Sequence, residues 1–278
     1  MRFRTLLAFL NFSVLLISSL LLNEAFAGPK KVIRLSTFEA PPFMSETLPE
    51  QGAAIYALRE MLKKQGYSLE VTFAPFLRAR SLSLQRKDSS GFFPVTDVNV
   101  TSDFQLSKTI YTSTWGFAER KNRLIKWNRA EDLAPYKIGN VKGYDLDDTL
   151  ELVNKRQALK IDESPSDELN LLKLANSRID LALIDTTMFE YLMKSSPKLR
   201  PYGGQMQINA KTIHLDEYGV GFKKTALGKE HMQIFNKTFS REEFTRMVDF
   251  YFKTYLSEKP ERVPTSTQFP NIGYFKFR

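Results

Sequence analysis

The segment SPSDELNLLKLANSRIDLALID, from Ser164 to Asp185, contains the signals of a helix followed directly by a strand. Ser164 is placed to cap the helix, Pro165 suits its first position, and Asp167 stands where a capping box has its acid. Apolar side chains follow at helical spacing, at Leu169, Leu171, Leu172, Leu174 and Ala175. The run IDLALI (179–184) is nearly all apolar, as is typical of a strand covered on both faces in a parallel sheet.

Asp185 ends this strand, and two roles are open for its carboxylate. In open α/β sheets, ligands bind beyond the carboxyl ends of the strands, so Asp185 is a candidate ligand-binding residue. Asp is also favoured as a helix N-cap, and TTMFEYLM follows it directly. One residue can fill both roles.

Strands and helices alternate along the rest of the chain. The helix AAIYALREMLKKQG (53–66) has one apolar face and a glycine stop, and SREEF (240–244) opens another helix with a capping box. The expected strands are VIRLS (32–36), LEVTF (69–73), GFFPV (91–95), TWGFAER (114–120), KIGNV (137–141) and EYGVGFKK (217–224). This alternation predicts an α/β protein in which helices flank mostly parallel sheets, and about 250 residues suffice for two lobes.

The N-terminal 27 residues read as a cleavable signal peptide. Arg2 and Arg4 precede an apolar run from residue 6 to residue 22, and AFA (25–27) is a small-x-small cleavage site. An uncleaved anchor is the alternative, because the run approaches the roughly 18 residues that span a bilayer. We expect cleavage and export to the periplasm. The chain has no cysteine, so it cannot be a lipoprotein.

Composition excludes several classes of function. Without cysteine there is no disulfide, thiolate nucleophile or thiolate metal site, and the two histidines, His214 and His231, lack metal-ligand spacing. No GxSxG nucleophile motif is present. The net charge of +9 includes +1 from the first 27 residues, which leaves +8, and the basic residues are scattered. We therefore expect no metal, no cofactor, no catalytic residues and no nucleic-acid partner.

Six motifs in order resemble the periplasmic solute-binding proteins of family 3, the polar amino acid binders that serve ABC transporters. They are IRLSTFEAPPFM, EVTFAPFLRA, FQLSKTIYTSTWGFAERK, EDLAPYKIGNVKGY, LLKLANSRIDLALIDTTMFEYLM and YGVGFKK. The resemblance implies two α/β lobes joined by two crossover strands, with ligand bound between them. Lobe 1 would comprise residues 28–117, lobe 2 residues 118–217, and residues 218–278 would return to lobe 1. TWGFA (114–118) and YGVGF (218–222) would form the hinge, and Asp185 would meet the ammonium group of the ligand.

The chain departs from this family at the segment VTDVNVTSDFQLS (95–107). Amino acid binders of the family carry an Arg here that binds the ligand's α-carboxylate, and this segment contains no Arg or Lys. A bidentate guanidinium is hard to replace. Either Arg78 serves instead, or the ligand is not a free amino acid; the structural alternative for Arg78 is a surface residue at a helix start.

The predicted ligand-binding residues lie in loops at strand ends. They are Glu39, Phe43, Arg78, Phe93, Thr96, Lys142, Gly143, Tyr144 and Asp185. Phe43 and Phe93 are equally typical of core packing. A helix start after Lys142 and Gly143 would offer free backbone N–H groups to an anion.

The resemblance implies a monomeric binding protein that delivers a small polar solute to an ABC transporter. A ligand sensor for a membrane receptor would share the same cleft. A third possibility is an enzyme on this scaffold, such as a dehydratase acting on a cyclic hydroxy acid, with Glu39 and Asp185 as its candidate acid and base.

The signal peptide gives the first prediction. We expect the exported product to begin at Gly28, because the cleavage site ends at Ala27. Intact-mass spectrometry of the periplasmic fraction measures this directly. A mass that includes residues 1–27 would show that the segment is retained.

Overall fold

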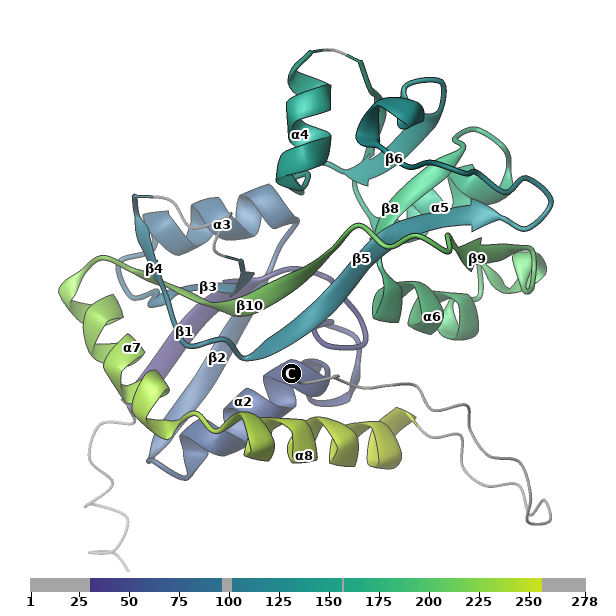
Figure 1. The fold of residues 1–278 in the computed structure, drawn as a ribbon. Helices are drawn as coiled ribbons and strands as arrows, with labels where there is room; N and C mark the ends of the chain where they lie inside the picture. The colour runs from purple at the N-terminus through teal and green to yellow at the C-terminus, as the bar shows by residue number, and fades with distance from the viewer. Residues whose placement is uncertain (1–30, 97–101, 157, 257–278) are drawn as a thin grey trace, which may run out of the picture.

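Two lobes share one pair of long strands in the computed structural model, which describes residues 31–96, 102–156 and 158–256 (Figure 1). The predicted signal peptide lies outside these residues. The described strands form a mixed sheet in the order β2-β1-β3-β10-β5-β8-β6-β7. In this part of the chain, none of the helices combines the length and the apolar character needed to cross a bilayer.

Lobe 1 is built on three parallel strands. Strands β1 (Lys31–Thr37), β2 (Tyr67–Phe73) and β3 (Gly91–Val95) pair in the order β2-β1-β3, and β3 then pairs antiparallel with β10. Its other elements are α2 (Ala53–Lys63), α3 (Phe76–Gln85), β4 (Phe104–Leu106), α7 (Ala226–Thr238) and α8 (Arg241–Tyr251). The C-terminal helices α7 and α8 pack against α2 of this lobe.

Lobe 2 repeats this arrangement. Strands β6 (Lys137–Val141), β7 (Lys160–Ser164) and β8 (Leu181–Asp185) are parallel in the order β7-β6-β8, and β8 pairs antiparallel with β5. Its other elements are α4 (Asp148–Lys155), α5 (Asp167–Ala175), α6 (Thr186–Ser195) and β9 (Met206–Ile208). Every residue of β8 is buried, in agreement with its apolar sequence.

Strands β5 (Tyr111–Arg120) and β10 (His214–Lys223) connect the lobes. They pair antiparallel with each other from Tyr111–Tyr218 to Trp115–His214, and this two-stranded segment is called the crossover ribbon below. Beyond it, β5 pairs with β8 of lobe 2, and β10 pairs with β3 and β4 of lobe 1. The ribbon thus overlaps the predicted hinge segments only at their edges, and the predicted boundaries at 117/118 and 217/218 fall inside these strands.

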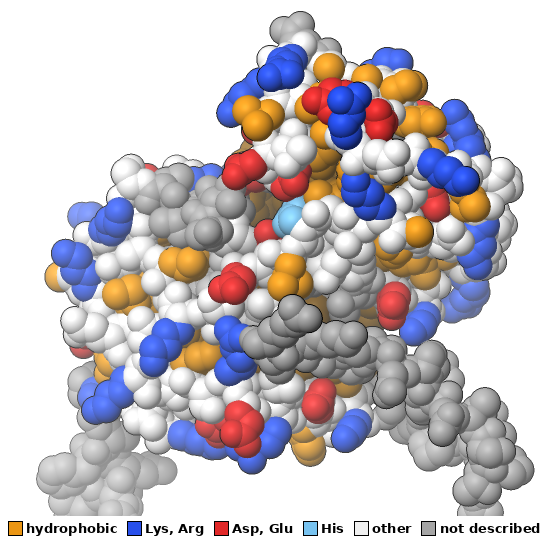
Figure 2. All heavy atoms as spheres, viewed as in Figure 1, with side chains coloured by type: hydrophobic (Ala, Val, Ile, Leu, Met, Phe, Trp, Pro, Cys, Tyr) orange, Lys and Arg blue, Asp and Glu red, His pale blue; other side chains and the backbone are white. Residues whose placement is uncertain are grey.

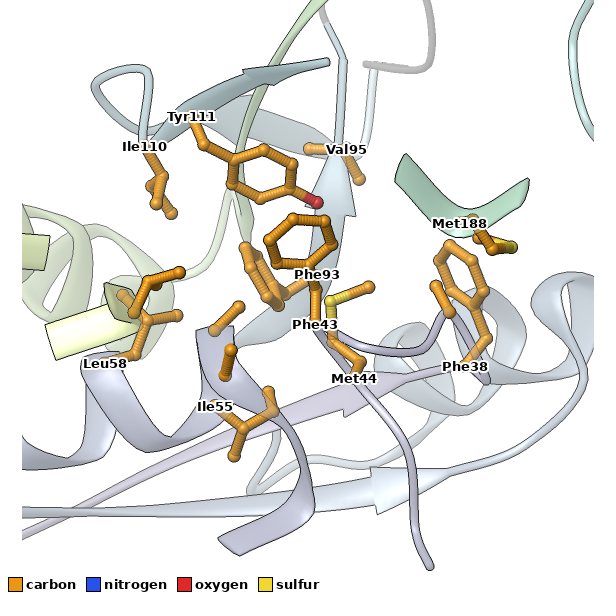
Figure 3. Close-up of a cluster of buried hydrophobic side chains, with 14 of the residues drawn as sticks. Phe38, Phe43, Met44, Ile55, Leu58, Phe93, Val95, Ile110, Tyr111 and Met188 are labelled. Atoms are coloured by element: carbon orange, nitrogen blue, oxygen red, sulfur yellow. The ribbon is translucent and has the colours of Figure 1, made fainter. Parts of the chain in front are cut away.

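Aromatic rings fill the core of lobe 1 next to the ribbon. Phe43 stacks on Tyr111 with ring centroids 5.4 Å apart, and Phe93 meets Tyr111 edge-on at 6.5 Å (Figure 3). Phe93 is completely buried. A separate core in lobe 2 contains Phe117, Leu133, Ile138, Leu150, Leu181 and Leu183.

The predicted helix cap at Ser164 is wrong. Ser164 is the last residue of β7 and pairs with Val141, so its backbone is extended. Ser166 caps α5 instead, with its hydroxyl oxygen accepting the N–H of Leu169. The short strands β4, β7 and β9 were not expected from the sequence, because three to five residues give too little periodicity to identify a strand.

The close approach of β3 and β10 gives a stability prediction. A Cβ atom on Gly91 would lie 2.1 Å from the carbonyl oxygen of Gly221. Since both atoms belong to paired strands, Gly91→Ala should lower the free energy of unfolding by about 1–3 kcal/mol, measured by chemical denaturation. The control is Gly203→Ala, where the nearest atom is 3.4 Å away. Equal stability of the two variants would contradict the strand pairing.

Candidate functional site

A cavity of about 70 Å³ lies between the lobes. In Figure 2 the surface is hollowed there, with acidic and histidine side chains near its mouth. Lobe 1 contributes Phe38, Ala40, Phe43, Met44, Phe76, Pro94 and Val95; lobe 2 contributes Tyr144, Asp145, Asp185 and Met188; and the crossover ribbon contributes Tyr111, Trp115, His214, Asp216 and Tyr218. Both lobes and both crossover strands therefore shape one site.

Strand alternation explains why the ribbon supplies so many of these side chains. Residues two apart on a strand share a face, and directly paired residues share it across the ladder. Tyr111 faces Tyr218 with stacked rings 4.9 Å apart, and Trp115 faces His214 at 6.3 Å. Leu215, which lies on the other face, is exposed.

Asp185 fills both roles that its sequence position left open. Its Oδ1 accepts the N–H groups of Thr187 at 2.8 Å and Met188 at 3.0 Å, which caps α6, and its Oδ2 accepts the hydroxyl of Ser113. The side chain also lines the cavity. Burial raises the pKa of Asp185 and the nearby charge of Asp216 adds to this, while the three hydrogen bonds oppose it.

Asp216 is the centre of a hydrogen-bonded chain. The indole N–H of Trp115 donates to the Tyr218 hydroxyl at 2.7 Å, and that hydroxyl donates to Asp216 Oδ2 at 3.1 Å. His214 Nε2 lies 3.1 Å from Asp216 Oδ1. Burial lowers the pKa of His214, but the hydrogen bond and charge of Asp216, with Asp147, outweigh it and leave that pKa raised. The chain holds Asp216 in place at the cavity wall.

Tyr144 links the lobes across the cavity. Its ring makes edge contacts with Phe76 at 5.3 Å and Phe38 at 5.9 Å in lobe 1, and with Trp115 at 5.8 Å. Its hydroxyl donates to Asp167 Oδ2 at 3.4 Å. Burial, and then the charge of Asp185, raise the pKa of Asp167 to about 7.

Solved structures with the same arrangement identify the fold, although no family model and no curated protein matches the sequence. The ligand-binding core of GluR0 from Nostoc punctiforme, in complex with L-glutamate, superposes with a TM-score of 0.64 at 14% identity, covering 81% of this chain and 100% of that one. AbpA from Streptococcus pneumoniae, an amino acid ABC transporter substrate-binding protein bound to L-arginine, gives 0.63 at 18% identity, covering 82% and 98%. This is the periplasmic-binding-protein fold.

A third relative of this binding-protein fold is a histidine kinase sensor domain. It matches with a TM-score of 0.64 at 13% identity, covering 82% of this chain and 97% of that one. The resemblance to amino-acid-binding periplasmic proteins that was drawn from the sequence is thus confirmed at the level of the fold, as are the two lobes.

Three of the nine predicted ligand-binding residues line the cavity of this binding-protein fold. They are Phe43, Tyr144 and Asp185. Phe93 belongs to the buried core, and Thr96 is buried just after β3 without reaching the cavity lining. The ligand-binding role of each remains a prediction.

The predicted charged residues lie elsewhere. Arg78 is exposed on α3, Lys142 is exposed, and Glu39 is exposed with its carboxylate accepting the N–H of Glu46 at 2.8 Å. The helix expected after Lys142 and Gly143 is α4, which begins at Asp148 with Asp147 as its N-cap, so the backbone N–H groups next to Gly143 do not lie at the helix start. Two aspartates close to the cap position explain the later start, since Asp favours the N-cap and the first turn.

Sequence reasoning missed most of the ribbon residues. His214 and Trp115 both line the cavity, and neither was among the predicted ligand-binding residues. The available signal was the alternation in YTSTW (111–115) and HLDEY (214–218), which places polar and aromatic residues on one strand face. Among the described residues, no group of three or more His, Asp and Glu side chains has the geometry of a metal site.

The raised pKa of Asp167 gives a pH prediction. The folded state holds this proton more tightly than the unfolded state, so the free energy of unfolding should fall as pH rises from about 4 to about 7. Asp167→Asn removes the titration. The substitution should raise the free energy of unfolding by a few kcal/mol more at pH 8 than at pH 4, because a difference of one pKa unit corresponds to about 1.4 kcal/mol. Thermal melts across this range measure the difference.

Asp162→Asn is the control of opposite sign. Hydrogen bonds from Lys137 and Lys173 lower the pKa of Asp162, so its carboxylate stabilises the fold above pH 4 and loses this effect in acid. The control should therefore destabilise the protein more at pH 7 than at pH 3. A pH-independent effect of Asp167→Asn would contradict a neutral, buried Asp167.

Proposed function

We propose that this protein is an exported, monomeric binding protein that encloses a small polar solute between its lobes and delivers it to an ABC transporter in the membrane. The observation that carries the proposal is the cavity itself, since its walls come from lobe 1, lobe 2 and the crossover ribbon together. A ligand in such a site contacts both lobes at once and therefore stabilises the closed arrangement over an open one.

Contacts between the lobes support this interpretation. The ring of Tyr144 from lobe 2 packs against Phe38 and Phe76 of lobe 1. Leu77 on α3 lies against Gly143, where an added Cβ would approach its side chain to 2.5 Å. These contacts join the lobes beside the cavity without a covalent link, as a site that opens and closes requires.

A sensor role is the second candidate. The sensor domain of a histidine kinase shares the fold, and a sensor would use the same cavity to report a ligand to a membrane receptor. Deleting the gene and measuring uptake of the identified ligand separates the two. Loss of uptake supports delivery to a transporter, and intact uptake with a lost transcriptional response supports sensing.

Enzyme catalysis finds less support than binding. Of the two acid–base candidates, Glu39 is outside the cavity lining. Asp185 is engaged with Ser113 and with the backbone of α6. A general base needs a free lone pair within reach of the proton that it removes, and these contacts occupy much of the capacity of this carboxylate.

Ligand binding can be tested with a thermal-shift panel of amino acids, amines, sugars, small acids and short peptides. One class should raise the melting temperature in a saturable manner, because a ligand that binds only the folded state stabilises it. Trp115 lines the cavity, so its fluorescence should report the same binding curve, and Trp115→Phe should abolish that signal while Trp127 remains. Failure of every class to bind would contradict the proposal.

Asp185 allows a sharper prediction. Asp185→Asn should weaken the affinity for the ligand that the panel identifies by roughly 2–5 kcal/mol, because a buried charged hydrogen bond is lost. It should change thermal stability little, since Asn caps helices about as well as Asp.

The matched control is Asp132→Asn. Its carboxylate also accepts two backbone N–H groups, from Asn128 at 2.9 Å and Arg129 at 3.0 Å, and it does not line the cavity. Calorimetry should show unchanged affinity for this variant. Unchanged affinity of Asp185→Asn would instead remove Asp185 from the binding site.

A further inference from the structure

The cavity is acidic although the chain as a whole is basic. Three carboxylates line it, from Asp145, Asp185 and Asp216. Asp167 accepts a hydrogen bond from the hydroxyl of Tyr144, which also lines the cavity. No Lys or Arg is among the lining residues of the described chain. The net charge of the whole sequence is +9, so the local excess of negative charge is a property of this site and not of the average surface.

Neutral groups provide most of the partners of these carboxylates. Asp185 accepts hydrogen bonds from a hydroxyl and two backbone amides, and Asp216 accepts one from the Tyr218 hydroxyl. His214, beside Asp216, is the one residue of the described lining that can carry a positive charge. Among the described residues that line the cavity, no Lys or Arg side chain pairs with Asp145 or Asp185, which favours a cation there.

One arginine outside the cavity lining acts on a carboxylate of the cavity. Arg80, on α3, acts electrostatically on Asp145, whose pKa burial nevertheless raises. Arg78 and Lys142 are exposed and do not line the cavity.

Aromatic rings form the rest of the wall. The electron-rich face of a Trp, Tyr or Phe ring attracts cations, most strongly where water is excluded. Among the described residues, seven such rings line the cavity, from Phe38, Phe43, Phe76, Tyr111, Trp115, Tyr144 and Tyr218. Rings combined with carboxylates favour a positively charged ligand over an uncharged polar one.

The described residues that line the cavity include no Lys or Arg that could pair with a ligand carboxylate. The amide groups on either side of Gly143, once candidates for an anion, already donate to backbone oxygens: Lys142 N–H to Ser164 at 2.8 Å and Tyr144 N–H to Val141 at 3.0 Å. Side-chain atoms of Leu77 cover Gly143. A carboxylate buried without donors or a cation is strongly disfavoured, and here it would also meet the charges of three aspartates.

We propose that the cavity binds a small organic cation, an amine or alkylammonium compound, that carries no carboxylate. This inference rests on the proposed binding function and specifies its ligand. Asp185 of lobe 2 and Asp216 of the crossover ribbon would both contact the positively charged group of the ligand. The aromatic rings would pack against the alkyl part of the ligand.

The test compares amines with their carboxylated counterparts by calorimetry on the full mature chain. The pairs are agmatine with arginine, cadaverine with lysine, and choline with glycine betaine. In at least one pair, the compound without the carboxylate should bind at least about tenfold more tightly. The carboxylate of its counterpart is negatively charged and would be repelled by the aspartates of the cavity. Each pair keeps the cationic group: agmatine and cadaverine have hydrogen in place of the carboxylate, and choline has a hydroxymethyl group in its place.

Variants identify the groups responsible. Asp216→Asn and Asp145→Asn should each weaken binding of the preferred amine by about tenfold or more. The exposed side chain of Asp145 keeps this variant informative if Asp216→Asn unfolds. Glu217→Gln is the matched control, because Glu217 lies on the opposite face of β10 from Asp216 and is exposed, and it should leave affinity unchanged.

The outcomes separate the two proposals. Tighter binding of the amino acids or betaine, or of a neutral sugar from the wider panel, would overturn the cation proposal and leave the binding function standing. Unchanged amine affinity in both aspartate variants would also overturn it. If no amine and no other compound in either panel binds, both proposals are wrong.

Discussion

The antiparallel pairing of β5 with β10 is the constraint on which the rest of the structure depends. The two strands run through both lobes, and each continues into the sheet of a different lobe. Because paired residues share a face, one ladder aligns Tyr111, Ser113 and Trp115 with Tyr218, Asp216 and His214. The same pairing holds the lobes together and supplies part of the wall of the cavity, so a ligand bound there, as proposed, would contact the strands that connect the lobes.

Buried carboxylates create an electrostatic tension in this arrangement. Asp185 and Asp167 both have raised pKa values because burial disfavours their charged forms and because Asp185 acts on Asp167. Hydroxyl and backbone donors hold these groups in position without neutralising them. Folding thus places ionisable carboxyl groups where their charged forms cost stability, as is common at functional sites. Away from the cavity, Asp162 forms salt bridges with Lys137 and Lys173, and its charge therefore stabilises the fold.

Regular elements with a strong local pattern could be predicted from the sequence. The strand GFFPV and the strand KIGNV lie where their apolar runs predicted them, and the helix face of Ile55, Leu58 and Met61 is buried. Helix capping was predictable for Ser240 but not for Ser164, because the extended pairing of Ser164 with Val141 depends on a strand more than twenty residues away. Local signals cannot reveal a competing long-range partner.

By itself, the sequence determined the α/β class, the repetition of strand and helix in two sets, and the position of Asp185 at a strand end before a helix. These depend on periodicity and capping, which act over a few residues. Only the tertiary structure decided which side chains meet. His214 and Asp216 lie about a hundred residues from Trp115 and face it only through the β5–β10 register. Arg78 and Lys142 have the right chemistry for an anion but point to solvent, because packing between the lobes, and not residue type, decides which groups line the cavity.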